Sequence, residues 1–448
     1  MSTATPSVNL FLLRALRIVI RADSDPARQV LFANLMQARL AVRLAYRIHR
    51  WLGGTRASAL LLSGYGLAYF LRISPPADPD VPVVAVAKHV NARRQIDRVS
   101  AWLGDGHCGA VRTGFRLRGG LSGARSLVRR TSRGRLLRTV RIVRVLDRRY
   151  GFLVACRAAA AIAWYARTKH ILLGHRPGAV LVSSDSNPEE VGFTAAASAL
   201  GIPRVFVSHA YPTPFSPPLD FTLSILEGEA AVRARQKKGS IKGGIVLAGV
   251  EGESAPLDPA RFDRANPVIG IFAPKAVSWP TLEAIIVDCR HRFGARQIVI
   301  RWHPSRLDPA RHLHALGDLS GIEESPMGAA LPDVARRCDW VIADENSNVH
   351  LPVLKLGIPT VAVKRLGIYP QSRSDMYGFA AAGIVFPAVS SIRDVEADAF
   401  KAFFGGGWAS RFRQYDASYL RPQDEIGGEV QAAIWSLFDA RSAEATYA

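Results

Sequence analysis

Short apolar runs alternate with helix-like stretches in two successive series along this 448-residue chain, and no other feature restricts its fold more. Apolar runs separated by amphipathic segments predict parallel strands joined by crossover helices. Two such series predict an α/β protein made of two doubly wound, Rossmann-like domains. The length agrees with this prediction, because 448 residues are more than one ordinary hydrophobic core accommodates.

The predicted elements divide at residues 249–267, a segment rich in glycine, proline and charge. Before it we predict strands at 81–90, 108–114, 179–186 and 202–210 and helices at 91–103 and 188–201. After it we predict strands at 266–275, 296–305, 340–347 and 358–365 and helices at 279–294, 331–339, 348–357 and 427–440. The predicted domains are therefore residues 81–255 and residues 266–400, followed by a C-terminal helical segment at 401–448.

The excess positive charge of the chain lies in its first third. Residues 1–150 hold 27 arginines and lysines against 7 acidic residues, whereas the rest of the chain holds 31 against 30. A surface of one sign usually meets a partner of the opposite sign. We therefore expect the first third to meet something anionic, which is either lipid headgroups or nucleic acid.

A basic amphipathic helix is predicted over residues 31–52. Its arginines recur on one face and its apolar residues lie beside them; they are Arg39, Arg43, Arg47 and Arg50, and Leu40, Leu44, Ile48 and Trp51. This combination is typical of a helix that lies in a membrane interface. The alternative is a helix packed on its own protein with solvated arginines.

Two further segments extend this pattern. Residues 57–71 carry no charge but are fewer than the roughly 20 residues that a membrane-spanning helix needs, so we expect a buried or interfacially inserted segment. Residues 112–149 hold 13 arginines and one acid, Asp147. Within this segment Arg138, Arg141, Arg144 and Arg148 alternate with apolar residues and predict a second basic helix. Residues 1–80 are accordingly predicted to form a basic amphipathic helical region that associates with a membrane.

The cysteines argue against stabilisation by disulfides or zinc. Cys108, Cys156, Cys289 and Cys338 are widely spaced and form no Cys-x-x-Cys pair, which favours a reducing compartment. We predict no metal site. A cleavable signal peptide is not expected either, because the first nine residues lack a basic start and no cleavage site follows.

Ligands of doubly wound domains bind beyond the carboxyl ends of the strands, so chemistry is expected in the loops there. In the second domain, His303 ends the apolar run of the strand at 296–305 and is followed by Pro304. Its imidazole can donate a hydrogen bond to a phosphate, or pair with one when protonated. The alternative is a turn histidine without a ligand.

A second loop of that domain, after the strand WVIA, holds Glu345, Asn346, Ser347 and Asn348. The last three are good N-cap residues, and the N–H groups at the start of the following helix can bind an anion. Glu345 could instead accept hydrogen bonds from ribose hydroxyls. Helix capping without any ligand is the alternative.

Two loops of the first domain are expected to meet at one edge of its sheet. They are residues 183–187 and residues 208–212. Asp185 or His209 could take a proton from a substrate hydroxyl there. For Asp185 the alternative is capping of the helix that begins near Pro188.

Taken in order, these motifs resemble a known family. They are VFVSHAYP around His209, IRWHPS around His303 and DWVIADENSNV followed by LKLGIPTV around Ser347. Together they resemble the bacterial GT-B polysaccharide transferases, which include capsule polymerases, polysialyltransferases and CDP-glycerol glycerophosphotransferases. The resemblance covers about residues 180–390. The chain has His209-Ala210 where the family usually has His-Gly, and Glu227-Gly228 is a poor match to its Asp/Glu-Asp/Glu-Gly element.

The resemblance implies a GT-B fold, in which two Rossmann-like domains face each other across a cleft, and a metal-independent glycosyltransferase without a cofactor. It implies that His303, Ser347 with its neighbours, and Lys275 hold the phosphates of a CMP-, CDP- or UDP-linked sugar donor. The acceptor would be a lipid-linked or polysaccharide chain in capsule or lipopolysaccharide synthesis. The enzyme would then lie peripherally on the anionic cytoplasmic face of the bacterial inner membrane, and no nucleic-acid partner is expected.

Three other functions stay open at this stage. A nucleotide-sugar epimerase of the GT-B type would share the fold, although that class is usually soluble. A non-catalytic nucleic-acid-binding protein would fit the strongly basic composition, but no helix-turn-helix, zinc-finger or RNP pattern is present. A degenerate transferase acting as an assembly partner would fit the departure at His209-Ala210.

Overall fold

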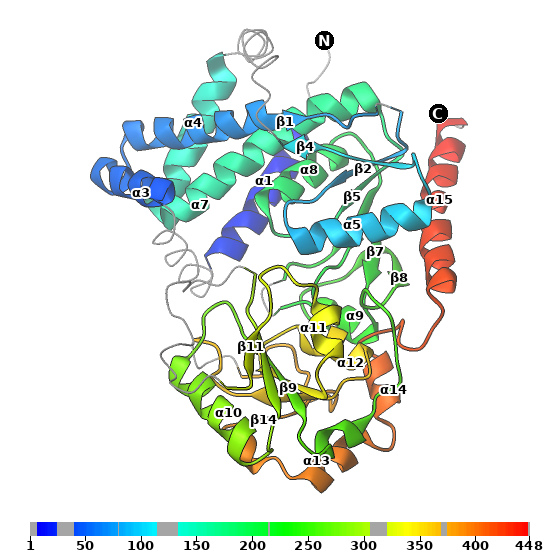
Figure 1. The fold of residues 1–448 in the computed structure, drawn as a ribbon. Helices are drawn as coiled ribbons and strands as arrows, with labels where there is room; N and C mark the ends of the chain where they lie inside the picture. Colours follow the sequence, from blue (N-terminus) through cyan, green and yellow to red (C-terminus); the bar gives the residue numbers. More distant parts are fainter. Residues whose placement is uncertain are drawn as a thin grey trace.

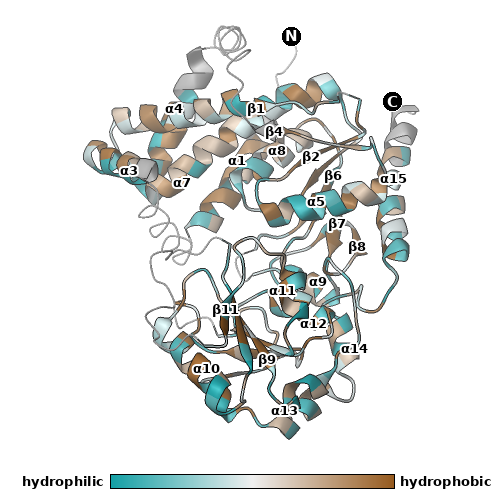
Figure 2. Ribbon diagram, in the orientation of Figure 1, coloured by the Kyte–Doolittle hydropathy of each residue, from teal (hydrophilic) through white to brown (hydrophobic). Residues whose placement is uncertain are grey.

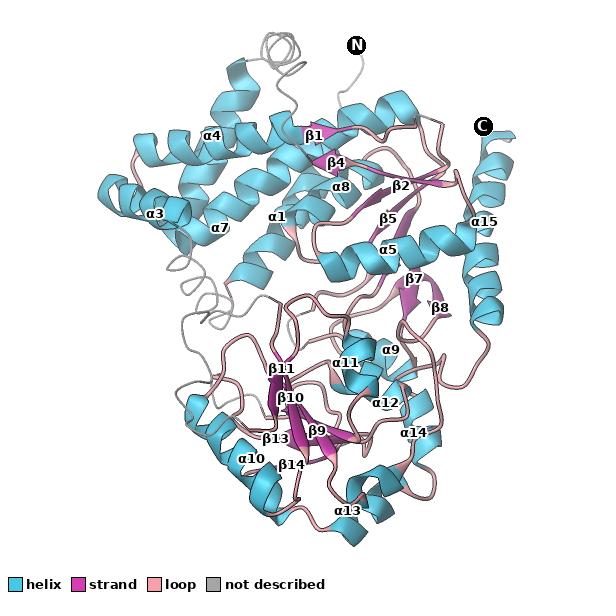
Figure 3. Cartoon of the chain, in the orientation of Figure 1, coloured by secondary structure: helices cyan, strands magenta, loops and turns pink. Residues whose placement is uncertain are grey.

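The computed structural model describes residues 7–24, 40–78, 80–113, 133–213, 216–304, 320–368 and 374–446. Figure 1 shows two lobes, with the first domain and the N-terminal helices in the upper lobe and the second domain in the lower. Each lobe is built around one six-stranded parallel sheet, whose strands and covering helices Figure 3 distinguishes. The predicted fold class, α/β with two doubly wound, Rossmann-like domains, is confirmed.

The sheet of the first domain has the strand order β3-β2-β5-β6-β7-β8, and all its strands are parallel. The bounds are Val83–Val86 (β2), Cys108–Ala110 (β3), Ala179–Val182 (β5), Arg204–Val207 (β6), Asp220–Leu226 (β7) and Lys242–Leu247 (β8). The chain builds outward from β2 to one side and from β5 to the other. The topological switch point of this sheet therefore lies between β2 and β5.

Helices cover both faces of this sheet, because successive strand residues point to opposite sides. Val83 and Ala85 pack with α5 and α15, whereas Val84 and Val86 pack with α7 and α8. Figure 2 shows most of these strands in the brown of apolar residues. The helices of this domain are α5 (Val90–Leu103), α7 (Arg133–His175), α8 (Pro188–Ser198), α9 (Glu229–Gln236) and α15 (Gln423–Thr446).

The N-terminal elements pack on the first domain and do not form a separate unit. Helix α1 lies against α7 and α8, α4 lies against α7, and β1 pairs with β4 in antiparallel orientation. Their bounds are Ser7–Asp23 (α1), Leu40–Leu52 (α3), Arg56–Arg72 (α4), Ile73–Ser74 (β1) and Arg112–Thr113 (β4). Helix α7 is kinked at Gly151, whose φ is 82°. The start of the predicted helix at 31–52, with Arg39, lies outside the described residues, as does the arginine-rich stretch 114–132.

Asp147, the one acid of the arginine-rich segment, joins three of these helices. Its Oδ1 lies 2.7 Å from Nε2 of His49 on α3, and its Oδ2 accepts a 2.7 Å hydrogen bond from Oγ of Ser58 on α4. Asp147 itself belongs to α7 and is buried. A buried carboxylate with both oxygens partnered holds α3 and α4 in fixed positions on α7.

The sheet of the second domain has the order β11-β10-β9-β12-β13-β14, again with all strands parallel. The strands are β9 (Val268–Phe272), β10 (Gln297–Arg301), β11 (Ile322–Glu324), β12 (Trp340–Asp344), β13 (Thr360–Val363) and β14 (Phe386–Val389). The helices are η1 (Pro259–Asp263), α10 (Trp279–His291), α11 (Leu331–Arg336), α12 (His350–Lys355), η3 (Ile392–Asp394), α13 (Ala397–Phe404) and α14 (Trp408–Arg413). The switch point of this sheet lies between β9 and β12.

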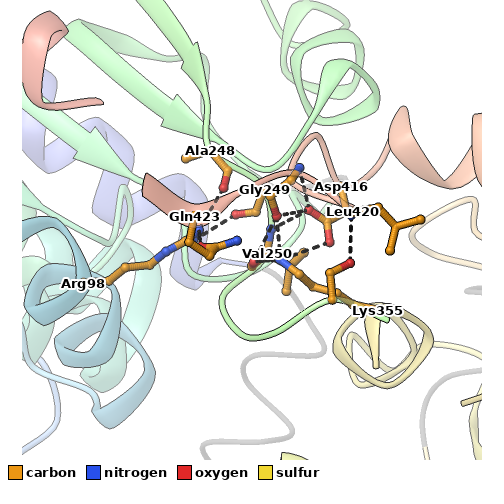
Figure 4. Close-up of polar contacts among 10 residues, drawn as sticks. Arg98, Ala248, Gly249, Val250, Lys355, Asp416, Leu420 and Gln423 are labelled. Atoms are coloured by element: carbon orange, nitrogen blue, oxygen red, sulfur yellow. Dashed lines mark hydrogen bonds and ion pairs between the residues drawn. The ribbon is translucent and has the colours of Figure 1, made fainter. Parts of the chain in front are cut away.

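The chain crosses between the domains twice, and the two crossings lie side by side (Figure 4). The first follows β8, and the second follows α14 and leads to α15, which returns to the first domain and packs on α5. Asp416 of the second crossing accepts a hydrogen bond from the backbone N–H of Val250 in the first, at 3.0 Å. Arg98 of α5 donates to the carbonyl oxygens of Ala248 and Gly249 at 2.9 and 3.2 Å. The predicted C-terminal segment thus belongs in part to the first domain.

The structure describes several elements that the sequence analysis did not predict. They include β1, β7, α9, β8, β11, β14 and α13. Strand β8 begins with a lysine and two glycines, and its first four residues are exposed because it lies at the sheet edge. An exposed edge strand lacks the apolar run by which buried strands are recognised.

The four cysteines are free thiols. Burial raises the pKa of Cys108 to about 11 and that of Cys156 to about 12, so neither is an activated nucleophile. Among the residues that the structure describes, no three His, Cys, Asp or Glu side chains gather in a group that could hold a metal ion. The described helices include none that is long and apolar enough to cross a membrane.

Candidate functional site

The carboxyl ends of the strands of both sheets meet at the junction between the domains. Burial lowers the pKa of His89, which follows β2, and nearby positive charges lower it further, among them Lys275, which follows β9 in the second domain. Burial and then the charge of Arg94 on α5 lower the pKa of Arg301 at the end of β10. Charged groups at the strand ends of the two domains are therefore close enough to change each other's pKa, as groups that surround a shared ligand would be.

Both topological switch points also lie at this junction. In the first sheet the residues beyond the switch point include His89 and Asp185, and in the second they include Lys275 and residues 345–348. Ligands of doubly wound sheets bind at such points, outside the carboxyl ends of the strands. Two of the four loops selected from the sequence, residues 183–187 and 345–348, thus follow strands that flank a switch point, and Lys275 follows a third such strand.

His209 lies just beyond β6, and the neighbouring strand end orients its imidazole. Its Nδ1 makes a hydrogen bond to the carbonyl oxygen of Ser183, which follows β5. A carbonyl oxygen only accepts, so Nδ1 carries the proton and Nε2 of the neutral ring keeps its lone pair. This is the tautomer that a general base acting through Nε2 requires. The prediction that the loops after β5 and β6 meet at one edge of the sheet is confirmed.

Glu227 and Gly228, which follow β7, support this loop. The buried carboxyl of Glu227 accepts a 2.6 Å hydrogen bond from Oγ of Ser208, the residue before His209, and burial raises its pKa. Gly228 allows the second crossing to approach, since a Cβ there would lie 2.5 Å from the carbonyl oxygen of Gln414. The pair that matched the family element poorly is therefore part of the framework behind His209.

Asp185 has a different environment from His209. Its carboxylate forms an ion pair with Arg235 of α9 and lines a cavity of about 130 Å³ that α1 and α8 help to form. It does not cap α8, whose N-cap position is Asn187, so that alternative is wrong. Because Arg235 binds it, the carboxylate of Asp185, which the sequence analysis named as an alternative base, already has a partner. A catalytic role for Asp185 stays a prediction and would require Arg235 to share or release it.

Three charged residues that the sequence analysis missed complete the first-domain edge. Lys88 follows β2, and Glu189 and Glu190 begin α8. Nζ of Lys88 forms an ion pair with Glu189, and the backbone N–H of Lys88 donates to Oε1 of Glu190 at 3.3 Å. The sequence did hold signals for them, namely a lysine-histidine pair directly after an apolar run and an acidic pair directly after Pro188.

Glu190 makes the stability of the protein depend on pH. Burial, and then the negative charge of Glu189, raises its pKa from 4.5 to about 8. The folded protein therefore keeps a proton on Glu190 between these two values while the unfolded chain releases it. The contribution of Glu190 to the free energy of unfolding is therefore fully present below pH 4.5 and is lost as the pH rises from there through about 8.

Replacement of Glu190 by glutamine is expected to remove this loss, because glutamine does not ionise in either state. Relative to wild type, Glu190→Gln should gain as much as about 4 kcal/mol of unfolding free energy as the pH rises from about 5 to about 8.5. Urea unfolding across this range measures the difference, and Glu283→Gln on the exposed side of α10 is the matched control. A difference that does not change with pH would show that Glu190 ionises normally.

Lys275 and His303 place two nitrogen groups at the second-domain edge. Burial lowers the pKa of Lys275. Burial, and then the charges of Lys275 and Arg301, lowers the pKa of His303 to about 4. His303 is therefore neutral near neutral pH, and of the two modes expected from the sequence the structure favours donation of a hydrogen bond over an ion pair.

The loop after β12 is held by its own side chains. The carboxylate of Glu345 accepts hydrogen bonds from Oγ of Ser374 at 2.8 Å and from the N–H of Asp375 at 3.3 Å. Oδ1 of Asn346 accepts one from the N–H of Met376 at 2.8 Å. Both side chains thus hold residues 374–376 against the strand end, and a role of Glu345 towards ribose stays a prediction.

The helix that follows this loop begins later than expected. Helix α12 starts at His350 and has Val349 at its N-cap, without a side-chain cap, so capping by Asn346, Ser347 or Asn348 is wrong. Oγ of Ser347 accepts a hydrogen bond from the N–H of Val349 at 3.3 Å. In the described part of the chain, the buried Oδ1 of Asn348 has no hydrogen-bond partner. Asn348 therefore offers an unused acceptor at the switch point.

Aromatic rings join the two edges of the junction. Tyr211, two residues after His209, lies 5.2 Å from Tyr415, 5.4 Å from Phe379 and 6.2 Å from Tyr377, measured between ring centroids. Tyr377 follows the segment that Glu345 and Asn346 hold. Packed rings thus connect the loop that holds His209 to the segment that contacts the loop after β12.

Comparisons with known proteins give similarities at the level of solved structures only. No protein-family model matches the chain, and no curated protein matches it. Similar solved structures include a UDP-N-acetylglucosamine 2-epimerase from Rickettsia bellii, with 12% identity, a TM-score of 0.45, and coverage of 81% of this chain and 96% of that one. Another is MnaA of S. aureus in a structure with UDP, with 10% identity, a TM-score of 0.47, and coverage of 77% and 94%. A third is MurG of Acinetobacter baumannii, with 11% identity, a TM-score of 0.40, and coverage of 81% and 99%.

Proposed function

We propose that the chain is a GT-B glycosyltransferase, which transfers a sugar from a nucleotide-activated donor to an acceptor hydroxyl. One observation carries the proposal: an oriented imidazole of the first domain and a cationic strand edge of the second lie at the same junction. The contact of Nδ1 with Ser183 aims Nε2 of His209 as the free nitrogen of the ring, while Lys275 and His303 offer groups that bind phosphate. Transfer from a nucleotide-activated sugar needs a base on one side and a phosphate-binding edge on the other.

On the donor side, Lys275 and His303 would contact the phosphate oxygens of a CMP-, CDP- or UDP-linked sugar. Their burial strengthens such contacts, because water competes less for the phosphate. The unpartnered Oδ1 of Asn348 is suited to a ribose hydroxyl or to a base N–H. Glu345, Asn346 and Ser347 would complete this side, Glu345 by exchanging its present partners for ribose.

In the transfer step, Nε2 of His209 takes the proton of the acceptor hydroxyl as its oxygen bonds to the anomeric carbon of the sugar. The bond between that carbon and the phosphate oxygen breaks, and the electron pair leaves with the nucleotide. Lys275 and the N–H of His303 stabilise the charge that develops on the leaving phosphate. The step requires no cofactor, because the donor already carries the leaving group.

We place the acceptor at the cytoplasmic face of the bacterial inner membrane, as a lipid-linked or polysaccharide chain of the cell surface. The excess of positive charge in residues 1–150 supports this, since each basic residue near an anionic leaflet adds about 1 kcal/mol to binding. Capsule and lipopolysaccharide synthesis are the settings in which such acceptors occur.

Binding of nucleotides tests the donor side. Calorimetric titration of CMP, CDP, UDP and GDP is expected to show one preferred nucleotide for the wild-type protein. His303→Ala should weaken its binding by about 10- to 100-fold, since it removes a hydrogen bond to a charged group. His291→Ala, at an exposed position on α10, is the matched control and should bind as wild type does. A folded wild-type protein that binds none of the four would refute the donor site.

A further inference from the structure

Helix α4 buries its small residues together with Leu62, and exposes most of its other large apolar residues. The buried residues are Ser58, Ala59, Leu62, Ser63 and Gly66. The exposed ones include Leu60, Leu61, Leu67 and Leu71, with Leu60 at 60% exposure. A helix on a water-exposed surface normally turns its large apolar residues inward. Among the residues that the structure describes, none covers the outer face of α4, where apolar side chains require a partner.

The packing of α4 on α7 fixes this orientation. A Cβ at Gly66 would lie 3.0 Å from the carbonyl oxygen of Ala159 on α7, so the two backbones approach closely there. Ser58 also donates to the buried Asp147 of α7 at 2.7 Å. Because small residues and a buried hydrogen bond hold the inner face, α4 cannot turn its leucines inward without losing both.

Helix α3 extends the apolar surface and adds positive charge to it. Trp51 is 86% exposed, and Leu44 and Ile48 are exposed as well. Arg43, Arg47 and Arg50 are exposed beside them, and none pairs with a carboxylate in the described part of the chain. Apolar residues with uncompensated arginines at their border match the layered chemistry of an anionic bilayer, acyl chains below and phosphates above.

We propose that this surface docks on an anionic lipid bilayer, with its apolar side chains among the acyl chains and its arginines at the headgroups. The α3–α4 face consists of Leu44, Ile48, Trp51, Leu60, Leu61, Leu67 and Leu71, together with Arg43, Arg47 and Arg50. A second copy of the chain is a poorer occupant, because the same arginines would then face each other. Helix α4 has 17 residues, so it lies in the interface and does not span it.

The inner side of α4, opposite its exposed leucines, contacts the acceptor side of the proposed site. Nζ of Lys88 lies 5.6 Å from the ring centroid of Tyr69 on α4 and pairs with Glu189. A bilayer bound to the α3–α4 face would therefore be separated from Lys88 by the width of α4, and lipid-linked acceptors would approach the first-domain edge around this helix. This part of the inference rests on the proposed function, whereas docking itself does not.

Vesicle co-sedimentation of the full chain tests the docking. The vesicles contain equal parts of phosphatidylglycerol and phosphatidylcholine, or phosphatidylcholine alone. The variant Leu60→Ser, Leu67→Ser, Leu71→Ser should lower partition to the anionic vesicles by at least about tenfold, because three side chains lose their place among the acyl chains. Leu173→Ser with Val287→Ser, at exposed positions elsewhere, is the matched control and should bind as wild type does.

The arginines are tested separately. Arg43→Gln, Arg47→Gln, Arg50→Gln should lower binding to the anionic vesicles and reduce its dependence on salt. Equal binding of wild type and the leucine variant to vesicles would overturn the proposal. So would a wild-type dimer in sedimentation equilibrium that the leucine variant breaks. Nucleotide titration of the same variants should be unchanged, so that failure of docking and failure of the donor site are distinguished.

Discussion

Replacement of His209 by alanine is expected to lower the rate of sugar transfer by about 10²- to 10⁴-fold, the usual contribution of a positioned general base. Nucleotide affinity should stay unchanged, because the donor phosphates contact the second domain in the proposed site. The expectation depends on the hydrogen bond from Nδ1 to the carbonyl oxygen of Ser183, which leaves Nε2 as the acceptor. Transfer is measured with the nucleotide sugar whose nucleotide binds best in calorimetry.

His170→Ala is the control for this variant, since His170 is exposed on α7 and belongs to none of the loops of the site. A His209→Ala protein that transfers sugar at the wild-type rate would assign the base elsewhere. Asp185→Asn would then be the next variant, because Asp185 is the other base that the sequence offers. Loss of both nucleotide binding and transfer in His209→Ala would instead point to a damaged junction.

Replacement of Asp416 by alanine is expected to lower the free energy of unfolding by about 3 to 5 kcal/mol, since it leaves a buried charge without its partner. Nζ of Lys355 lies 3.5 Å from Oδ2 of Asp416, and their side chains are 1% and 0% exposed. Oδ1 of Asp416 also accepts hydrogen bonds from the N–H groups of Val250 and Ser418, each at 3.0 Å. Figure 4 shows that these contacts tie the two crossings to α12. Urea unfolding followed by circular dichroism measures the loss.

The double variant Lys355→Met, Asp416→Leu separates the cost of an unpaired charge from the loss of the pair itself. It should be destabilised less than Asp416→Ala, because it buries no charge. Glu429→Ala, which breaks the exposed pair with Arg421, should cost less than about 1 kcal/mol. If Asp416→Ala unfolds as wild type does, the crossings are not held by this pair.

The architecture was predictable from the sequence because strands and helices follow from the periodicity of apolar residues over short stretches. Apolar runs such as those around Val84, Val180 and Ile342 become fully buried central strands, and the helices between them follow from spacing alone. The edge strands β8 and β14 escaped prediction because residues at a sheet edge need not be apolar on both faces. The alternative of helix capping by residues 346–348 is wrong because α12 begins after Val349, and Asn346 instead binds a segment that is distant in sequence.

Only those site residues that directly follow a predicted strand could be predicted from the sequence. His209, Lys275 and His303 follow apolar runs, so the rule of strand carboxyl ends places them at the junction. Lys88, Glu189 and Glu190 also follow that rule but were overlooked, since each reads alone as an ordinary surface charge. The ion pair of Asp185 with Arg235 joins residues that are 50 positions apart, so no local sequence pattern predicts it.

By itself, the sequence determined two doubly wound domains, a basic first third and a set of strand-end loops, because these depend on residue order over short stretches. Tertiary structure alone decided which residues of α4 face outward, which tautomer His209 adopts and that the C-terminal helix returns to the first domain. Each of these depends on a partner far away in the chain: α7 for α4, Ser183 for His209 and α5 for α15. The physical reason is that burial and hydrogen bonding are properties of the packed chain, whereas periodicity is a property of the chain before it packs.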